Sequence, residues 1–554
     1  MHKSWKDIWL SFVVIFATIS LIGCGGGSTT SYSTSSGTES GTGGVEFSNE
    51  YTSPAELGIG DLMYINFDEL GDVSVDFSGV SPDAKFILIT GSASDSGSGT
   101  AMQISSDITQ GLEKDFDVIV SNEDVDEKDL DLDASEILSA WLRASEFEIA
   151  EREMPPDLNN NSKSLIISKS VSVGDISQFR VLSSLTSTSS YVTVEAEARY
   201  VGDEVAVYVD TTVPSSSLDD SDIAELGAFY DEVAVDEQNL IGDLPDINQD
   251  GKVVVLLTKQ INRLGELGGG IITGYFYGAD FYPQSASNQV SNYMEIVYMM
   301  VPDPNGLWGY RVSKDFAMSN LLRPVFPHEL QHAISYNNHV FINSGSPENN
   351  WLNEAMSHFM EDWMWVGVEN ASRYAIYLAS PSSYSLTATG SPNLGERGAS
   401  YLFLRYMYEQ SSDPDGFINR LDNTSLTGVD NLEDAFNGPS GFSSFHEFLA
   451  RWTVALALTN TGITQDSRYI YRNRVYNDST GYWQGVCTIC DADDNRGTVL
   501  HGVTTSEYSN SMNFSVDASA ARFFDILDVE NVSPVLSLSG SSTSSNFGAL
   551  IRQE

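Results

Sequence analysis

The sequence predicts a multidomain α+β protein, in which a central mixed domain is flanked by β-rich modules at both ends. Three observations lead to this prediction. The chain has 554 residues, and the roughly 500 that follow its polar N-terminal segment are too many for one hydrophobic core. Hydrophobic residues make up 41% of the chain, as in globular rather than disordered acidic proteins. Strand-like patterns at both ends give way in the middle to strands interleaved with long helical patterns.

The N-terminal module, residues 45–165, is predicted from short apolar stretches that alternate with Gly, Ser and Asp. Period-two patterning with turn residues at close intervals is typical of a β-sandwich. The stretches are 62–67, 73–77 and 86–90. An acidic helical segment follows around 136–143, and a polar linker follows around 155–163.

The central domain, residues 190–475, combines strands with longer helices, as in a catalytic domain of the α/β or α+β class. The predicted strands are a hairpin at 192–198 and 205–209, and buried strands at 253–257 and 294–299. The helical patterns cover much of 320–365, 399–410 and 445–458. After residue 475 the chain returns to short, Ser-rich, strand-like pieces, so 476–554 are predicted to form a small β-rich C-terminal module.

The first 23 residues are predicted to be a signal peptide. A short basic region precedes an apolar run that ends at Ile22; the run is short for a membrane span, which needs about 20 apolar residues, but suits an export signal. Leu21-Ile22-Gly23-Cys24 resembles the lipobox of bacterial lipoproteins, in which the cysteine is acylated and becomes the first mature residue. Residues 24–44 are predicted to be a flexible Gly/Ser/Thr tether. We therefore expect an exported protein of the bacterial cell envelope, lipid-anchored to a membrane through Cys24; a plain signal peptide with an incidental cysteine is the alternative.

The charge excludes one class of partner. The chain carries 77 acidic and 28 basic residues, for a net charge of −49. A protein that binds nucleic acid neutralises phosphates with clustered Lys and Arg, so no nucleic-acid partner is expected. The plainest interpretation of the charge is a strongly solvated, salt-tolerant surface, which also leaves carboxylates available for divalent cations.

Two cysteines remain after Cys24. Cys487 and Cys490 are predicted to form a local disulfide, because an even, closely spaced pair in an oxidising compartment is commonly oxidised. A four-cysteine zinc ribbon is excluded by the count. His501 nearby leaves a metal site open as the alternative.

The segment His328-Glu329-Leu330-Gln331-His332 carries the chemistry. On a helix, histidines at i and i+4 lie on one face one turn apart, so both imidazoles can bind one metal ion. Glu329 cannot share that geometry but lies close enough to accept a proton from a metal-activated water. Zinc suits these donors, since catalytic zinc keeps three protein ligands and one open position. The pattern is short, and two solvated histidines on a surface helix are the alternative, although apolar residues flank it on both sides.

Glu354 is predicted to be the third ligand. It follows His332 by 22 residues, within a second helical pattern that starts near Asn350. That spacing lets the first helix end and the chain reverse, so that the second helix lies alongside the first. Apolar residues at helical spacing define a core face of this second helix, and Glu354 lies off that face. An ordinary solvated glutamate is the alternative.

Segments 328–332 and 351–358 together resemble the gluzincin metallopeptidases, and among them the hyicolysin-type family. The similarity extends to 246–252, 273–276, 291–292 and 399–404, and covers about residues 190–475. The resemblance implies that His328, His332 and Glu354 bind one zinc ion per chain. It also implies that Glu329 is the general base for hydrolysis of peptide bonds in a protein or peptide substrate, with endopeptidase cleavage as the expected mode.

The sequence departs from the thermolysin-like pattern at one position. There, an acidic residue four positions after the ligand glutamate orients a histidine, whereas here that position is His358. Glu361 or Asp362, further along the helix, is the substitute that the sequence offers. Tyr401 and His446 are candidates, by residue type alone, for the group that stabilises the oxyanion.

A second cation is suggested by Asp246, Asn248, Asp250 and Gly251, whose spacing matches the first half of a calcium loop. Position twelve of that loop is Leu257 in place of the bidentate glutamate, so Ca²⁺ binding and a plain polar turn both stay open.

These observations predict an extracytoplasmic zinc metallopeptidase. One rival is a surface-binding lipoprotein that retains the peptidase fold with little or no activity; the intact Glu329 counts against it. The other rival is a metal-dependent hydrolase of a different substrate class, and only the family resemblance favours peptides over it.

Overall fold

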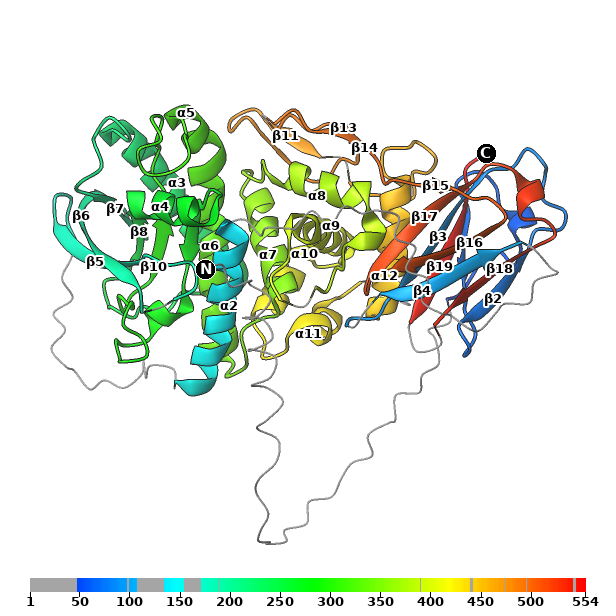
Figure 1. Cartoon of the computed structure of the whole chain (residues 1–554), viewed down its shortest axis with the longest axis horizontal. Helices are drawn as coiled ribbons and strands as arrows, with labels where there is room; N and C mark the ends of the chain where they lie inside the picture. Colours follow the sequence, from blue (N-terminus) through cyan, green and yellow to red (C-terminus); the bar gives the residue numbers. More distant parts are fainter. Residues whose placement is uncertain are drawn as a thin grey trace, which may run out of the picture. The chain divides into compact units, whose positions relative to one another are not determined.

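The computed structural model describes residues 47–96, 99–106, 134–153, 171–187, 189–388, 390–438, 442–472, 474–494, 496–541 and 545–554. The predicted signal peptide 1–23, the tether 24–44 and the lipidation residue Cys24 lie outside this part of the chain. Within it, the protein is mixed α+β with several sheets (Figure 1), as the predicted α+β fold class requires. No helix among the described residues is both long and apolar enough to cross a membrane.

Strands from the two ends of the chain form two sheets around one core. The sheet orders are β1-β19-β3-β17-β15 and β16-β4-β18-β2. The N-terminal strands are β1 (Leu62–Ile65), β2 (Asp72–Asp76), β3 (Phe86–Ser92) and β4 (Thr100–Ser105). The C-terminal strands are β15 (Ser506–Glu507), β16 (Ser511–Val516), β17 (Ala520–Ile526), β18 (Val535–Gly540) and β19 (Asn546–Arg552). Leu88, Ile104 and Leu538 are among the buried residues of the core that the two sheets share.

This arrangement differs from the separate β modules predicted at 45–165 and 476–554. Each sheet takes strands from both segments, as in the antiparallel pairing of β3 with β19. The sequence pattern places the helix α2 (Ala134–Arg152) in the N-terminal module. In the structure it packs on α4 and on the 3₁₀ helix Gly278–Phe281 of the central region. Period-two patterning predicts that a strand exists, but the distant strand it pairs with is decided by packing of the folded chain.

The central region contains a six-stranded sheet in the order β5-β6-β7-β8-β10-β9. Its strands are β5 (Ile176–Leu182), β6 (Tyr191–Val201), β7 (Val205–Asp210), β8 (Val253–Leu257), β9 (Gly274–Phe276) and β10 (Ile296–Met299). The predicted hairpin is confirmed as β6 and β7, and the buried strands as β8 and β10, which pair in parallel. β5 begins the sheet before residue 190, the predicted start of the domain. β9 is an edge strand, bound to β10 on one side.

Helices cover this sheet and continue beyond it. The two that matter for the site are α6 (Leu322–Tyr336) and α7 (Asn350–Trp363), which pack on each other, and α6 also packs on β9 and β10. π-helical turns at Ala317–Leu321 and Asn337–Ile342 bracket α6, a feature found frequently at functional sites. The remaining helices are α3 (Asp220–Ile241), α4 (Lys259–Gly268), α5 (Lys314–Phe316), α8 (Asn370–Ala379), α9 (Leu394–Gln410), α10 (Pro414–Asp422), α11 (Gly428–Ala435) and α12 (Phe445–Leu458).

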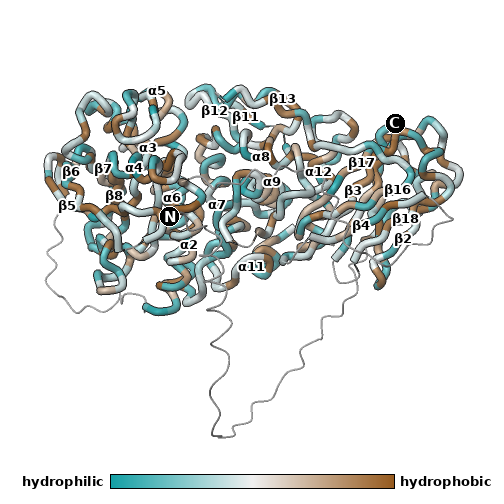
Figure 2. The backbone as a smooth tube through the Cα atoms, viewed as in Figure 1, coloured by the Kyte–Doolittle hydropathy of each residue, from teal (hydrophilic) through white to brown (hydrophobic). Residues whose placement is uncertain are grey.

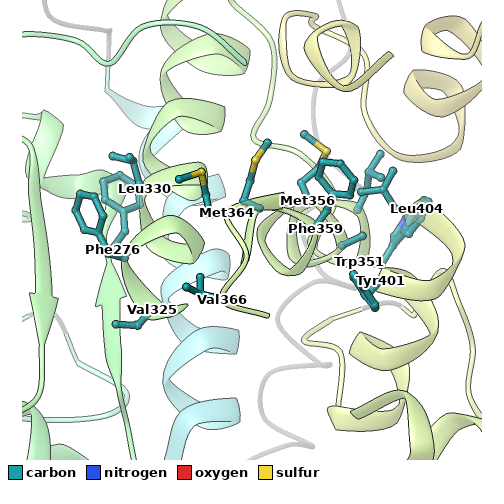
Figure 3. Packing of buried hydrophobic residues seen from close by; sticks show 14 of the residues in the cluster. Phe276, Val325, Leu330, Trp351, Met356, Phe359, Met364, Val366, Tyr401 and Leu404 are labelled. Atoms are coloured by element: carbon teal, nitrogen blue, oxygen red, sulfur yellow. The ribbon is translucent and has the colours of Figure 1, made fainter. Parts of the chain in front are cut away.

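The hydrophobic core is formed by the apolar residues of these helices and of the strands. Hydrophobic stretches of the chain coincide with buried elements such as β3, β8 and α12 (Figure 2). Figure 3 shows Met356 and Phe359 of α7 on the side where Leu404 of α9 lies. That apolar face fixes the rotation of α7, so its opposite side is turned toward α6.

Two short hairpins follow the helices, β11 (Val475–Asn477) with β12 (Tyr482–Gln484) and β13 (Ile489–Asp491) with β14 (Val499–His501). Cys490, in β13 of the second hairpin, forms a disulfide with Cys487. His501 ends β14, where it pairs with Ile489.

Candidate metal centre

Helix α6 positions the two histidines of the site. His328 and His332 stand one turn apart, with ring centroids separated by 4.9 Å. Their exposed fractions are 9% and 3%. They are therefore buried residues of the interface with α7, and not the solvated surface histidines of the alternative interpretation.

Helix α7 brings Glu354 to the same place. Its Oε2 lies 3.5 Å from Nε2 of His328, and its Oε1 lies 3.8 Å from Nε2 of His332. One ligand atom from each of the three residues lies within 4.8 Å of the other two, so the three could hold one metal ion. Glu354 is 1% exposed and is therefore not an ordinary solvated glutamate.

Glu361, one of the two substitutes that the sequence offered, holds the first histidine. Its Oε1 lies 2.8 Å from Nδ1 of His328 and 2.8 Å from Nδ1 of His358. Asp362 is engaged elsewhere, since it accepts a hydrogen bond from Arg405 at 2.7 Å. One ligand atom from each of His328, His358 and Glu361 likewise lies within 4.8 Å of the other two, so these three could also hold a metal ion. Because Glu361 binds the Nδ1 side of His328, while Nε2 faces Glu354, we assign Glu361 to orienting that ring.

The second histidine is oriented in the same way. Nδ1 of His332 lies 3.0 Å from the side-chain oxygen of Asn353. An imidazole that donates through Nδ1 presents its lone pair at Nε2. Both Nε2 atoms thus face the Glu354 carboxylate, and this donor set fits a metal ion.

The charges around these groups also favour a cation. Burial disfavours a charged imidazole, yet hydrogen bonds to Glu354 and Glu361 raise the pKa of His328 to about 9. Burial likewise disfavours the ionised form of Glu354, but Arg397 and the two histidines hold the pKa of its carboxyl well below the usual range. Surroundings that stabilise a protonated imidazole beside an ionised carboxylate can stabilise a bound metal cation by the same attraction.

Glu329 lies beside the metal group without joining it. Its Oε2 accepts a hydrogen bond from the backbone N–H of Phe276, on the edge strand β9, at 2.8 Å. Burial raises the pKa of its carboxyl above the ordinary value. A carboxyl whose pKa is shifted toward neutrality is better suited to accept and return a proton near neutral pH.

Three further residues of the site escaped the sequence reasoning. Arg397 of α9 donates to Oε2 of Glu354 at 2.7 Å, and Ser139 of α2 donates to Oε1 of the same carboxylate at 3.2 Å. Arg143 of α2 donates to the carbonyl of Phe276 at 2.9 Å. All three line, with the metal group, a cavity of about 110 Å³. No local pattern could have found them, because each is far from its partner in sequence.

The two oxyanion candidates do not take part in this cavity. Tyr401 is buried near Asp362 and Arg405. Burial and the charge of Asp362 raise the pKa of its hydroxyl well above the usual range, and Arg405 opposes this shift. His446 packs edge-on against Phe47, with ring centroids 5.3 Å apart. Neither is among the described residues that line the cavity, so the structure does not bring either of them to the metal group.

The suggested calcium loop folds as a turn bonded within itself. Asp246 accepts a hydrogen bond from Gly251 N at 3.2 Å, and Asp250 accepts one from Lys252 N at 2.9 Å and one from the Asn248 side chain at 2.9 Å. In the described part of the chain, no third His, Cys, Asp or Glu completes a metal group here. Calcium binding and a plain polar turn therefore both stay open.

Comparison with known proteins does not assign this site to a family. No protein-family model matches the chain, and a search of the curated proteins finds no match either.

Proposed function

We propose that the protein is an extracytoplasmic zinc-dependent peptidase of the gluzincin type, similar to the hyicolysin-like family. The observation that carries the proposal is that Nε2 of His328 and Nε2 of His332 both face the carboxylate of Glu354, with Glu329 beside them. Two imidazoles and a carboxylate with an open fourth position are the ligands of catalytic zinc in this class of enzyme.

The residues of the chain divide the chemistry between them. Zinc, when bound, supplies a Lewis acid that polarises a carbonyl and activates water. Glu329 accepts the proton of the attacking water and returns it to the leaving amine. Glu361 and Asn353 hold the two imidazoles so that Nε2 of each faces Glu354. Arg397 keeps Glu354 ionised.

The edge strand β9 supports a peptide as the substrate class. The side of β9 that does not pair with β10 lies next to Glu329, which accepts a hydrogen bond from the N–H of Phe276. An extended peptide adds to such an edge through main-chain hydrogen bonds, and this would bring its scissile bond past the metal group. A substrate without a repeating backbone has no comparable use for this strand.

The experiment that tests the proposal compares the zinc content and peptide-library cleavage of the wild type with those of Glu329→Gln. The wild type should carry about one zinc ion per chain and cleave peptides. The amide should lower turnover at least ~10²-fold, since it cannot accept the proton, and zinc should stay bound. A zinc-loaded wild type that cleaves no peptide would reject the proposal and favour the binding lipoprotein, and cleavage of non-peptide substrates alone would favour the other rival.

The proposed location has its own test. The lipobox-like segment that ends at Cys24 supports a lipid anchor. Cys24→Ser should release the protein from membranes or leave it unprocessed. Membrane fractionation of the wild type with no lipid attached to the mature protein would contradict the anchor without affecting the proposed chemistry.

A further inference from the structure

Helix α2 forms one wall of the candidate active site. Ser135, Leu138, Ser139, Leu142 and Arg143 line the cavity that also contains the metal group. The hydroxyl of Ser139 donates to Glu354 at 3.2 Å and accepts a hydrogen bond from Arg397 at 3.2 Å. The helix therefore contacts the carboxylate that the proposed function assigns to zinc.

The same helix occupies the backbone groups that a substrate would use. Arg143 donates to the carbonyl of Phe276 at 2.9 Å, and Glu146 accepts from the N–H of Gly278 at 2.7 Å. Phe276 ends the edge strand β9 and Gly278 lies two residues beyond it. An added peptide strand would bind such alternate acceptors and donors with its own N–H and C=O groups. The side chains of Arg143 and Glu146 thus stand in for the main chain of a bound peptide.

The space that remains is too small for a peptide. The cavity measures about 110 Å³, whereas sites that take drug-sized ligands measure roughly 300–1,000 Å³. A peptide that lies along β9 therefore cannot bind while α2 is in place.

The fully buried residues of α2 lie on one half of the helix. Its buried residues are Ala134, Leu138, Leu142, Arg143, Glu146 and Ile149. It belongs to no sheet, and the first strand of the central sheet, β5, begins only at Ile176. The helix can therefore leave its position without breaking any strand pairing of the central sheet.

From these contacts we propose that α2 is a built-in inhibitory segment, which excludes substrate by binding the β9 edge through Arg143 and Glu146 and which must leave for catalysis. The inference rests on the proposed peptidase function. Beyond that function, docking of α2 controls access to the metal group. The rate at which a chelator removes zinc measures this access without catalysis.

The test compares full-length wild type, Arg143→Ala/Glu146→Ala, and Glu148→Ala as a matched control, since Glu148 is exposed on the same helix. Two rates are measured on zinc-loaded protein: cleavage of a fluorogenic peptide library and zinc removal by a chromogenic chelator. Loss of two charge-assisted hydrogen bonds should raise the fraction of chains with α2 released, and both rates, by about tenfold or more. The control should match the wild type.

The outcomes separate the inference from the proposed function. Unchanged or slower cleavage with unchanged zinc removal in the double variant overturns the inhibitory role; a drop in turnover alone would make Arg143 a participant in the reaction. Faster zinc removal with no cleavage by any protein supports the covering role and rejects the peptidase. If the double variant does not fold, Leu142→Asp, which places a charge on the buried face of α2 alone, takes its place with the same expected changes.

Discussion

Helix α7 carries the carboxylate of Glu354 and helix α2 contacts it through Ser139, but the two helices are held in different ways. In α7, 12 of the 14 residues are buried. Glu354, Glu361 and Asn353 contact the two histidines of the site. The apolar face of α7, with Met356 and Phe359, lies on the side of α9 (Figure 3). In α2, six of the 19 residues are buried. α7 is therefore buried along almost its whole length, whereas α2 contributes only one face, including Leu138 and Leu142, to the same hydrophobic core.

This difference separates two tasks. A metal site needs ligands whose positions are fixed by packing and by hydrogen bonds behind them, and α7 provides both. A segment that covers a site needs only enough contacts to stay docked, because a stronger attachment would keep substrate out permanently. The predictions that follow test whether substitutions in the two helices have effects of these two kinds.

The largest expected effect is that of Glu354→Ala in α7. Two histidines alone hold zinc poorly, so zinc content and peptide cleavage should fall together, by more than the roughly 10–100-fold that loss of an orienting partner costs. Zinc titration and cleavage assays measure both. Glu148→Ala in α2 changes an exposed side chain that does not line the cavity and should leave zinc affinity close to that of the wild type. Full zinc and full activity in Glu354→Ala would place the third ligand elsewhere.

The next effect is that of Glu361→Gln. The amide oxygen can still accept hydrogen bonds, but the substitution removes the charge that orients His328 and His358, so zinc affinity should fall by about 10–100-fold. Competition with a chelator of known affinity measures it, and Glu148→Gln in α2 is the control. An unchanged affinity would mean that packing alone orients His328.

Stability should also distinguish the helices. Phe359→Ala removes a fully buried ring from α7 and should cost about 3–5 kcal/mol of unfolding free energy. Leu142→Ala in α2 removes a side chain that is 2% exposed, but its cost cannot exceed the docking free energy of α2, because the helix can detach first. Urea unfolding should therefore show the smaller loss for Leu142→Ala. Equal losses would make α2 a part of the same cooperative core.

The same contrast explains what the sequence could predict. His328, Glu329 and His332 form a local pattern, and Glu354 lies on the next helix, so helical geometry and a short reversal suffice to bring them together. Glu361 was one of two acidic candidates at the right distance along the same helix. Ser139, in contrast, meets Glu354 across 215 positions, and no periodicity encodes which distant helix covers a cavity. Strand-like patterns at the two ends of the chain predict strands there. No local pattern predicts that strands from the two ends pair with each other, because they are far apart in sequence.

The smallest expected effect concerns pH and the docking of α2. Burial raises the pKa of Glu146 to about 7; Arg143 and the N–H of Gly278 oppose the shift, and the charges of Glu329 and Glu354 add to it. When α2 is released, Glu146 meets water and its pKa returns toward the ordinary 4.5. The docked state thus binds the proton more tightly, so this group stabilises docking fully below the lower pKa, and the contribution is lost as pH rises through about 7.

Hydrogen exchange of the α2 amides at pH 6 and pH 8 checks this sign. Each rate is divided by that of the unfolded peptide at the same pH, so that only the opening of the helix is compared. Protection of α2 should be lower at pH 8 than at pH 6, while protection of α7 should change little, because its burial does not depend on Glu146. Glu146→Gln cannot titrate and should flatten the dependence for α2. Equal protection of wild-type α2 at both pH values would show that the Glu146 carboxyl does not contribute to docking, and would leave Arg143 and the apolar face to hold the helix.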